Sequence, residues 1–202
     1  MKSIKLLAFL ILLVTNYFLI NAQTNQKDIK TIYPDLKFDE SLASNALEKG
    51  TATIKGVLFT REKNGYGIKR GPKIYAANVI VNLFPVTPYL DSWFELRRKK
   101  ESKRTKVEMS NEAAKKCLET KTDDDGNFVF SKLKPGRYFL QSFIHSEYDY
   151  YKTVDTGQRD VNSAGDVTAY TKNVYYTNDQ DERIEKFIDV KPNVEIIEIK
   201  LK

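Results

Sequence analysis

Short stretches of alternating apolar and polar residues occupy most of the chain after residue 50. Alternation that is rich in β-branched and aromatic residues is typical of strands with one buried face. It predicts strands at 53–59, 77–84, 117–121, 128–130, 137–144, 173–176, 187–190 and 194–201. Segments rich in Gly, Pro, Asp and charge separate the strands and predict loops at 61–72, 122–127 and 152–168. Several short strands with few helices predict an antiparallel β-sandwich.

Residues 89–116 interrupt this strand pattern. Proline suits the first turn of a helix, so Pro88 predicts a helix start there. The helix would have an apolar face made of Tyr89, Trp93, Phe94 and Leu96. The run 97–106 then contains seven basic residues and one acidic residue, and we expect it to be a solvated, mobile loop. The functional alternative is weak contact with an anionic surface through Arg97, Arg98, Lys99 and Lys100.

The first 22 residues have the pattern of a cleaved signal peptide. Lys2 and Lys5 precede the apolar run 6–14, and the small residue Ala22 follows at the expected cleavage site. An uncleaved membrane anchor is the alternative, but nine apolar residues are well short of the roughly 20 that span a bilayer. We therefore expect an exported protein, located in the periplasm, on the outer surface or in the medium. Export also argues against a nucleic-acid partner for the basic run.

The stretch Thr122–Leu140 reads TDDDGNFVFSKLKPGRYFL, in which Asp, Gly and Pro mark two turns and aromatic residues alternate between them. It resembles the carboxypeptidase regulatory-like domain family, and 54–58 and 77–81 resemble the first two strands of that family. The matching positions are Thr122, Asp123, Gly126, Phe128, Phe130, Leu133, Pro135, Gly136 and Tyr138. The resemblance implies a transthyretin-like (prealbumin-like) β-sandwich of about seven strands.

The resemblance assigns 51–202 to that sandwich, with 89–116 as a short helical, basic insertion. The polar stretch 23–50 is then an N-terminal arm with weak structure, in which 41–49 can form a short helix. The matching motif serves turns and core packing, so it indicates an architecture rather than an active site.

The residue types needed for familiar catalytic or metal sites are scarce. The chain has one histidine, His145, and one cysteine, Cys117, which together serve zinc poorly. Asp123, Asp124, Asp125 and Asn127 are the calcium alternative to a simple turn, but they lack the spacing of a calcium-binding loop. We predict no catalytic residue, metal or cofactor. A small hydrolase that uses His145 with nearby acids is the enzymatic alternative.

Tyrosines cluster near residue 150. Tyr148, Tyr150 and Tyr151 lie close together in the sequence, with Tyr170, Tyr175 and Tyr176 further along. Exposed tyrosine can stack on sugars or line a protein interface, although packing is the more common role of tyrosine in a strand. The sequence thus predicts a non-enzymatic binding or structural module of the cell envelope, whose partner is a protein or a glycan. A carbohydrate-binding surface module is the specific alternative.

Overall fold

The computed structural model describes residues 29–63 and 68–202, so the predicted signal peptide at 1–22 lies outside the described residues. The chain divides into two compact units, and each is described here by itself. In the described chain, the smaller unit comprises 29–33 and Trp93–Glu108, and the larger unit comprises Pro34–Ser92 and Met109–Lys202, with 64–67 left out. Among the described residues, no helix is both long enough and apolar enough to cross a membrane.

The first sheet of the larger unit is built around one central strand. Its members are β2 (Ala52–Lys63), β3 (Lys69–Tyr75), β7 (Asn127–Leu133) and β10 (Ile196–Leu201). Strands β3 and β7 pair with β2 in the antiparallel sense, whereas β10 pairs with it in the parallel sense. The expected all-antiparallel pairing is therefore wrong at β10. The physical reason is that β10 follows a strand of the other sheet, so no hairpin fixes its direction. The loop expected at 61–72 is also wrong at 61–63 and 69–72, which belong to β2 and β3, while 64–67 lie outside the described residues.

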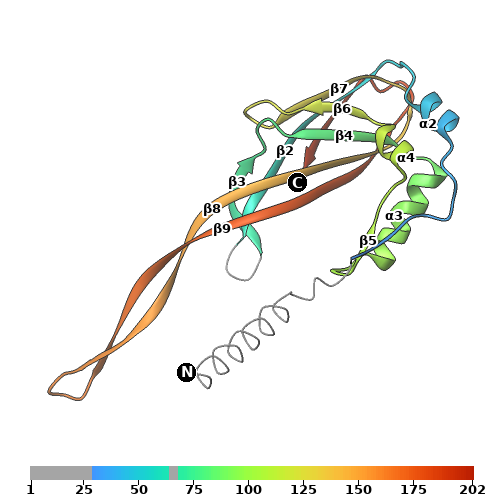
Figure 1. Ribbon diagram of the computed structural model, residues 1–202. Coiled ribbons are helices and arrows are strands. Elements are labelled where there is room, and N and C mark those ends of the chain that lie inside the picture. Colours follow the sequence, from blue (N-terminus) through green and yellow to red (C-terminus); the bar gives the residue numbers. More distant parts are fainter. Residues whose placement is uncertain (1–28, 64–67) are drawn as a thin grey trace, which may run out of the picture. The chain divides into compact units, whose positions relative to one another are not determined.

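The second sheet has the order β6-β4-β8-β9. Its strands are β4 (Ile80–Pro85), β6 (Leu118–Lys121), β8 (Gly136–Val161) and β9 (Val167–Val190). Every pairing in this sheet is antiparallel. Together the two sheets contain eight strands among the described residues, and both can be followed in Figure 1.

Buried side chains from both sheets meet in one hydrophobic core, which makes this unit sandwich-like. The first sheet contributes Ile54, Leu58, Phe128, Phe130, Leu133 and Leu201, and the second contributes Val81, Leu83, Tyr138, Leu140, Ile144, Ile184 and Ile188. The mostly-β class predicted from the alternation is therefore confirmed. Any larger residue at position 56 would force the core to shift, because a Cβ there would lie 2.2 Å from the ring of Phe128.

The turn between β6 and β7 explains the run of aspartates. The carboxylate of Asp123 accepts hydrogen bonds from the backbone N–H of Asn127 at 2.7 Å and of Asp125 at 3.0 Å. Hydrogen bonds from the Asn127 side chain and backbone hold the pKa of Asp123 below its ordinary value. Gly126 adopts φ 78°, which favours glycine. This carboxylate is thus engaged in closing the hairpin, as the turn interpretation requires.

Residues 34–50 pack against the sandwich, so the expected weakly structured arm is wrong for this part. Helix α2 (Glu40–Ala46) buries Ala43, and the hydroxyl of Tyr138 donates to the carbonyl of Ala46 at 3.1 Å. A short helix was expected at 41–49, where most of α2 lies. A further short helix, α4 (Asn111–Lys115), precedes Cys117, whose pKa is raised to about 11 chiefly by burial.

The smaller unit contains the end of α3 (Pro88–Lys100) and a parallel pair formed by β1 (Lys30–Ile32) and β5 (Thr105–Val107). Within it, the indole N–H of Trp93 donates to the carbonyl of Val107 at 3.3 Å. Helix α3 starts at Pro88 as predicted and continues to Lys100.

The mobile loop expected from residue 97 is wrong at its beginning, because Arg97–Lys100 form the last turn of α3. Arg97 is 6% exposed, and its guanidinium carbon lies 4.3 Å from the centroid of the Trp93 ring. Basic side chains are also favourable at a helix C-terminus, where the helix dipole is negative. The helix therefore continues through a sequence that looks like a charged loop.

Candidate functional site

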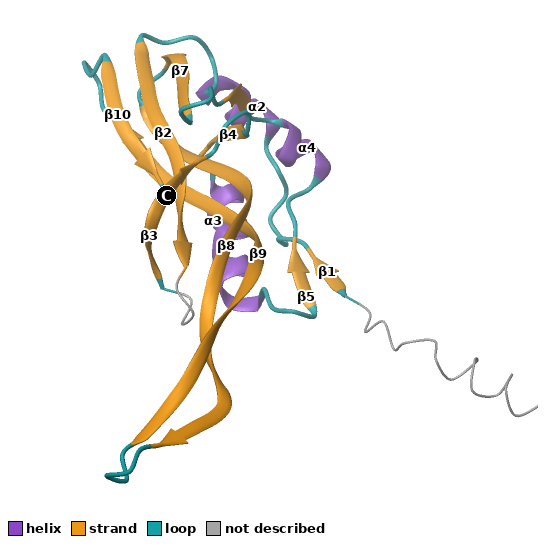
Figure 2. Cartoon of the chain, turned by 90° about the vertical axis from the view of Figure 1, so that its left-hand side faces the viewer, coloured by secondary structure: helices purple, strands orange, loops and turns teal. Residues whose placement is uncertain are grey.

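Strands β8 and β9 continue far beyond the strands that flank them. Strand β4 pairs with β8 only as far as Ser142, whereas β8 and β9 pair with each other from Gly136–Val190 to Val161–Val167. Residues 145–161 and 167–181 thus form a two-stranded extension, called here the β8–β9 ribbon, which leaves the sandwich in both views (Figures 1 and 2). The loop expected at 152–168 is wrong, because only 162–166 form the connecting turn. The polar residues between the short predicted strands are themselves paired between β8 and β9.

The base of the ribbon is fixed to β2 and β3. The hydroxyl of Tyr148 accepts from the N–H of Lys63 and donates to its carbonyl, each at 3.1 Å. Close by on β9, the Glu182 carboxylate accepts from Thr60 and pairs with Lys69. Burial alone would raise the pKa of Glu182, but these two partners hold it below its ordinary value. Tyr148 is therefore a structural anchor rather than a free contact surface.

Two tyrosines form an exposed pair on one face of the ribbon. Tyr151 lies directly opposite Tyr175 in the strand register, and their ring centroids are 6.0 Å apart. Tyr151 is 59% exposed and Tyr175 is 74% exposed. Cross-strand aromatic pairs stabilise a sheet, but they normally cover apolar surface as well. Here the rings remain largely open to solvent.

A second pair occupies the opposite face of the ribbon. Tyr150 stacks on Tyr176 with ring centroids 5.5 Å apart and an interplanar angle of 23°. The ammonium of Lys152 lies 5.8 Å from the Tyr150 centroid and 5.7 Å from that of Tyr176. This pair is less exposed than the first, and its stacking and cation–π contacts contribute to holding the ribbon together.

The structure brings the tyrosines together in a way that sequence reasoning missed. Alternation along one strand shows which side chains share a face, but it does not give the register with the partner strand. The pairing of Tyr151 with Tyr175 depends on that register across the long hairpin. The preference for buried packing holds for the half-buried Tyr148 and fails for Tyr151, which is exposed.

Acidic side chains lie beside the exposed pair, on the same face. Counting by twos from Tyr151 along β8 reaches Asp149, Glu147 and His145, and Asp179 and Asp181 lie opposite the last two. The Nδ1 atom of His145 lies 2.9 Å from Asp181 Oδ1 and 3.4 Å from Asp179 Oδ1. The hydrogen bond with Asp181 is the main reason that the pKa of His145 is raised.

This cluster is poorly suited to bind calcium or to act as a hydrolytic site. Ligand atoms of His145, Glu147 and Asp179 lie within 4.8 Å of one another, and all three side chains are exposed. Calcium takes six to eight oxygen ligands, so three exposed side chains from a ribbon fit it poorly. The acids that contact His145 are Asp179 and Asp181 of the partner strand β9, not residues next to it in the sequence. Within the described chain, no serine, threonine or cysteine is hydrogen-bonded to this histidine.

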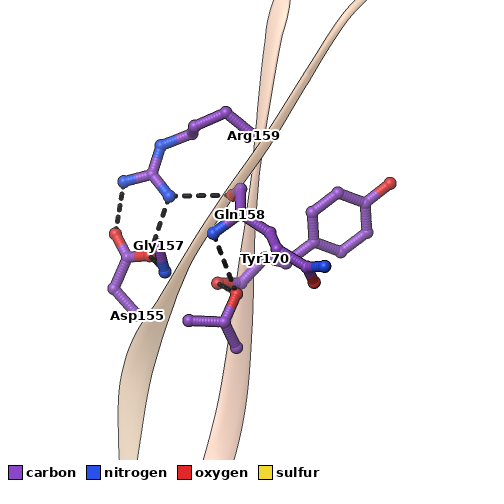
Figure 3. Close-up of polar contacts among 6 residues, drawn as sticks. Asp155, Gly157, Gln158, Arg159 and Tyr170 are labelled. Atoms are coloured by element: carbon purple, nitrogen blue, oxygen red, sulfur yellow. Dashed lines mark hydrogen bonds and ion pairs between the residues drawn. The ribbon is translucent and has the colours of Figure 1, made fainter.

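Nearer its tip, the ribbon contains a β-bulge. The strand register shifts between Asp155 and Arg159, and Gly157 adopts φ 79°. The carboxylate of Asp155 accepts from the N–H of Gly157 and from the Arg159 guanidinium, each at 2.8 Å (Figure 3). The ring of Tyr170 points away from this ion pair in the same view. Bulges increase local twist and redirect side chains, and this one has all its charges paired internally.

The basic residues predicted as ligand contacts belong to the smaller unit. Arg97 is buried, which removes it from a contact surface. Arg98 and Lys99 both approach Glu95, at 3.0 Å and 3.7 Å. Arg98, Lys99 and Lys100 remain exposed at the end of α3, so these three positions still allow contact with an anionic surface.

A solved structure resembles the fold of this chain. No family model matches the chain. No curated protein matches it either. A crystal structure of a Pseudomonas aeruginosa protein, named as a candidate carbohydrate-binding protein, superposes with a TM-score of 0.50. Its sequence is 18% identical, and the match covers 83% of this chain and 99% of the other. At this identity the likeness concerns the fold alone.

Proposed function

We propose that this protein is a non-enzymatic binding module that binds carbohydrate on the β8–β9 ribbon. The observation that carries the proposal is the pair Tyr151–Tyr175, which presents two largely exposed rings side by side. Sugar rings have apolar faces of C–H groups that pack on aromatic rings, while their hydroxyls bond to nearby polar groups. Two neighbouring tyrosines on a projecting ribbon offer such a surface for two successive sugar units.

The groups around the pair favour a neutral glycan. Asp149 and Thr177 lie opposite each other next to the tyrosines, and their side chains share a hydrogen bond of 2.8 Å. Carboxylates accept hydrogen bonds from sugar hydroxyls, and charge-assisted bonds are the stronger kind. The further acids Glu147, Asp179 and Asp181 repel a polyanion from this face. The ligand proposed here is therefore an uncharged oligosaccharide.

The structural neighbour supports this choice over other binding functions. Its name describes a candidate carbohydrate-binding protein, and the match covers nearly all of that chain. This support is a likeness of fold, so the tyrosine pair remains the main argument. Export to the cell envelope, proposed from residues 1–22, would place the ribbon among polysaccharides.

The proposal also includes a finer statement about the fold. We propose that the larger unit is a transthyretin-like sandwich of the carboxypeptidase regulatory-like type. The turn 122–127 and the alternating Phe128 and Phe130 occupy a hairpin and a shared core, as that family motif implies. An experimental structure whose strand order differs from that of transthyretin-like sandwiches would contradict it.

A binding experiment with paired variants tests the glycan site. A panel of neutral oligosaccharides, including cellohexaose, is titrated against the protein by calorimetry and NMR. For a ligand that binds, the double variant Tyr151→Ala/Tyr175→Ala should reduce affinity about tenfold or more, since each aromatic contact contributes roughly 1 kcal/mol. Tyr170→Ala is the matched control, because Tyr170 lies on the same ribbon and is 43% exposed but belongs to neither pair.

Two results would contradict the proposal. The first is that no neutral oligosaccharide in the panel binds. The second is that binding occurs but is equally strong in the double variant and the control. Circular dichroism spectra that match the parent protein would show that both variants are folded.

A further inference from the structure

A cleft in the sandwich, away from the tyrosine pairs, has a strongly positive lining. It has a volume of about 610 Å³ and lies against β2, β7, β9 and β10. Its lining residues are Lys55, Gly56, Val57, Asn127, Lys186, Glu198, Ile199, Lys200 and Lys202. Four lysines thus accompany a single carboxylate side chain. The volume falls in the range of sites for small organic ligands, roughly 300–1,000 Å³.

The lysines of the cleft lack acidic partners. Among the described residues, none of Lys55, Lys186 and Lys200 has a carboxylate within 4.0 Å, unlike Lys69 or Lys134. The ammonium of Lys186 instead donates to the backbone carbonyl of Lys200 at 3.2 Å, which ties its charge to β10. Four lysines against the one carboxylate of Glu198 leave an excess of positive charge, which raises the local positive potential, and a concave surface focuses it. The arrangement favours an anionic ligand.

The strand register spreads these charges along the cleft instead of gathering them at one point. Lys55 of β2 lies opposite Glu198 of β10, and Lys200 lies two residues further along β10. Two residues of a strand span about 6.6 Å, so the positive groups recur at a spacing longer than one small anion. Val57 adds half-buried apolar surface to the lining, whereas the side chain of Ile199 packs against the core. This combination suits an extended ligand that has both anionic groups and apolar patches.

We propose that this cleft is a second ligand site, which binds an acidic oligosaccharide through its carboxylate groups. The lysines pair with successive carboxylates, and the apolar surface of Val57 contacts the sugar rings. This site is independent of the glycan surface proposed on the ribbon, whose acidic face disfavours the same ligand.

The probe is trigalacturonic acid, with the neutral cellohexaose and inorganic phosphate as comparisons. The triple variant Lys55→Gln/Lys186→Gln/Lys200→Gln should lower the affinity for trigalacturonic acid about tenfold. Binding by the parent protein should also weaken as salt is raised, because the contacts are ionic and exposed. In the parent, the amide signals of β2 and β10 should shift on titration. Lys121→Gln is the matched control, since Lys121 is an exposed strand lysine of the other sheet.

The outcomes separate this proposal from its alternatives. Unchanged affinity in the triple variant, or no binding of trigalacturonic acid, would overturn it. Phosphate that binds as tightly as the trisaccharide would also overturn it, because the cleft would then be a general anion site. The variant Tyr151→Ala/Tyr175→Ala should retain trigalacturonic acid binding, so failure at the ribbon and failure at the cleft are distinguishable.

Discussion

The hydroxyl of Tyr148 on β8 forms two hydrogen bonds with the backbone of a single residue on β2, Lys63, and both are 3.1 Å long. A two-stranded ribbon is only marginally stable alone in water, so its attachment to the sandwich matters. These bonds hold the ribbon directly, and the contacts of Glu182 fix β9 next to the base of the ribbon. The anchor therefore positions the tyrosine pairs nearer the tip.

Removing the Tyr148 hydroxyl should loosen the ribbon. Tyr148→Phe deletes both bonds and leaves the Lys63 groups without this partner, at a cost of about 1–2 kcal/mol in the free energy of unfolding. Hydrogen exchange should show faster exchange for amides of 145–161 and 167–181, with the core strands little changed. Tyr150→Phe is the control, because the Tyr150 ring stacks on Tyr176 and its hydroxyl forms no hydrogen bond with any described residue. Equal exchange in the two variants would show that Tyr148 is not an anchor.

The core imposes a size limit at Gly56. An alanine Cβ there would lie 2.2 Å from the Phe128 ring, so the ring or the strand must move. We expect Gly56→Ala to lower the free energy of unfolding by about 1–3 kcal/mol, as overpacked cores do. Gly136→Ala is the matched control, since the nearest atom to its Cβ is 3.9 Å away. Urea denaturation of both variants measures the difference, and similar stabilities would contradict this account of Gly56.

The strands of the sandwich were predictable because each has a recognisable local sequence pattern. Alternating apolar residues such as Phe128 and Phe130 indicate a buried face, and the Asp-Gly turn before them fixes the hairpin. The ribbon was not predictable in the same way. Its side chains bury little apolar surface, so residues 152–161 resemble a loop, and their strand structure depends on pairing with β9. The end of α3 was missed for a related reason, because Arg97 buries a charged side chain against aromatic rings.

Arg97 should stabilise the smaller unit, although its side chain is charged. Its guanidinium carbon lies 4.3 Å from the Trp93 centroid and 5.0 Å from that of Phe94. Arg97→Ala removes this stacking and the packing of its long side chain. We therefore expect the free energy of unfolding to fall by about 1–3 kcal/mol. The fluorescence of Trp93, the single tryptophan, can follow unfolding of this unit.

Arg98→Ala is the control for this prediction. Its side chain is 67% exposed and pairs with Glu95 on the surface, where an ion pair contributes at most about 1 kcal/mol. The two variants should therefore differ clearly in their fluorescence melting curves. If Arg98→Ala were as destabilising as Arg97→Ala, the stacking on Trp93 would not be the cause.

His145 gives the ribbon base a pH dependence with a defined sign. Its hydrogen bond with Asp181, and then the charge of Asp179, raise the pKa of His145 above the ordinary 6.5. A raised folded-state pKa means that protonated His145 favours the folded ribbon. That contribution is complete below the unfolded pKa, near 6.5, and is lost as pH rises through the folded pKa.

The measurement is an NMR titration of the imidazole, whose ring signals are assigned without ambiguity because the chain has one histidine. Asp181→Asn should bring the measured pKa down toward 6.5, since it removes the main charged partner. Thr177→Val, on the same face of β9, is the control and should leave the titration unchanged. A parent pKa at or below 6.5 would contradict the pairing with Asp181. Because His145 is exposed, the effect should be seen in the titration before it is seen in global stability.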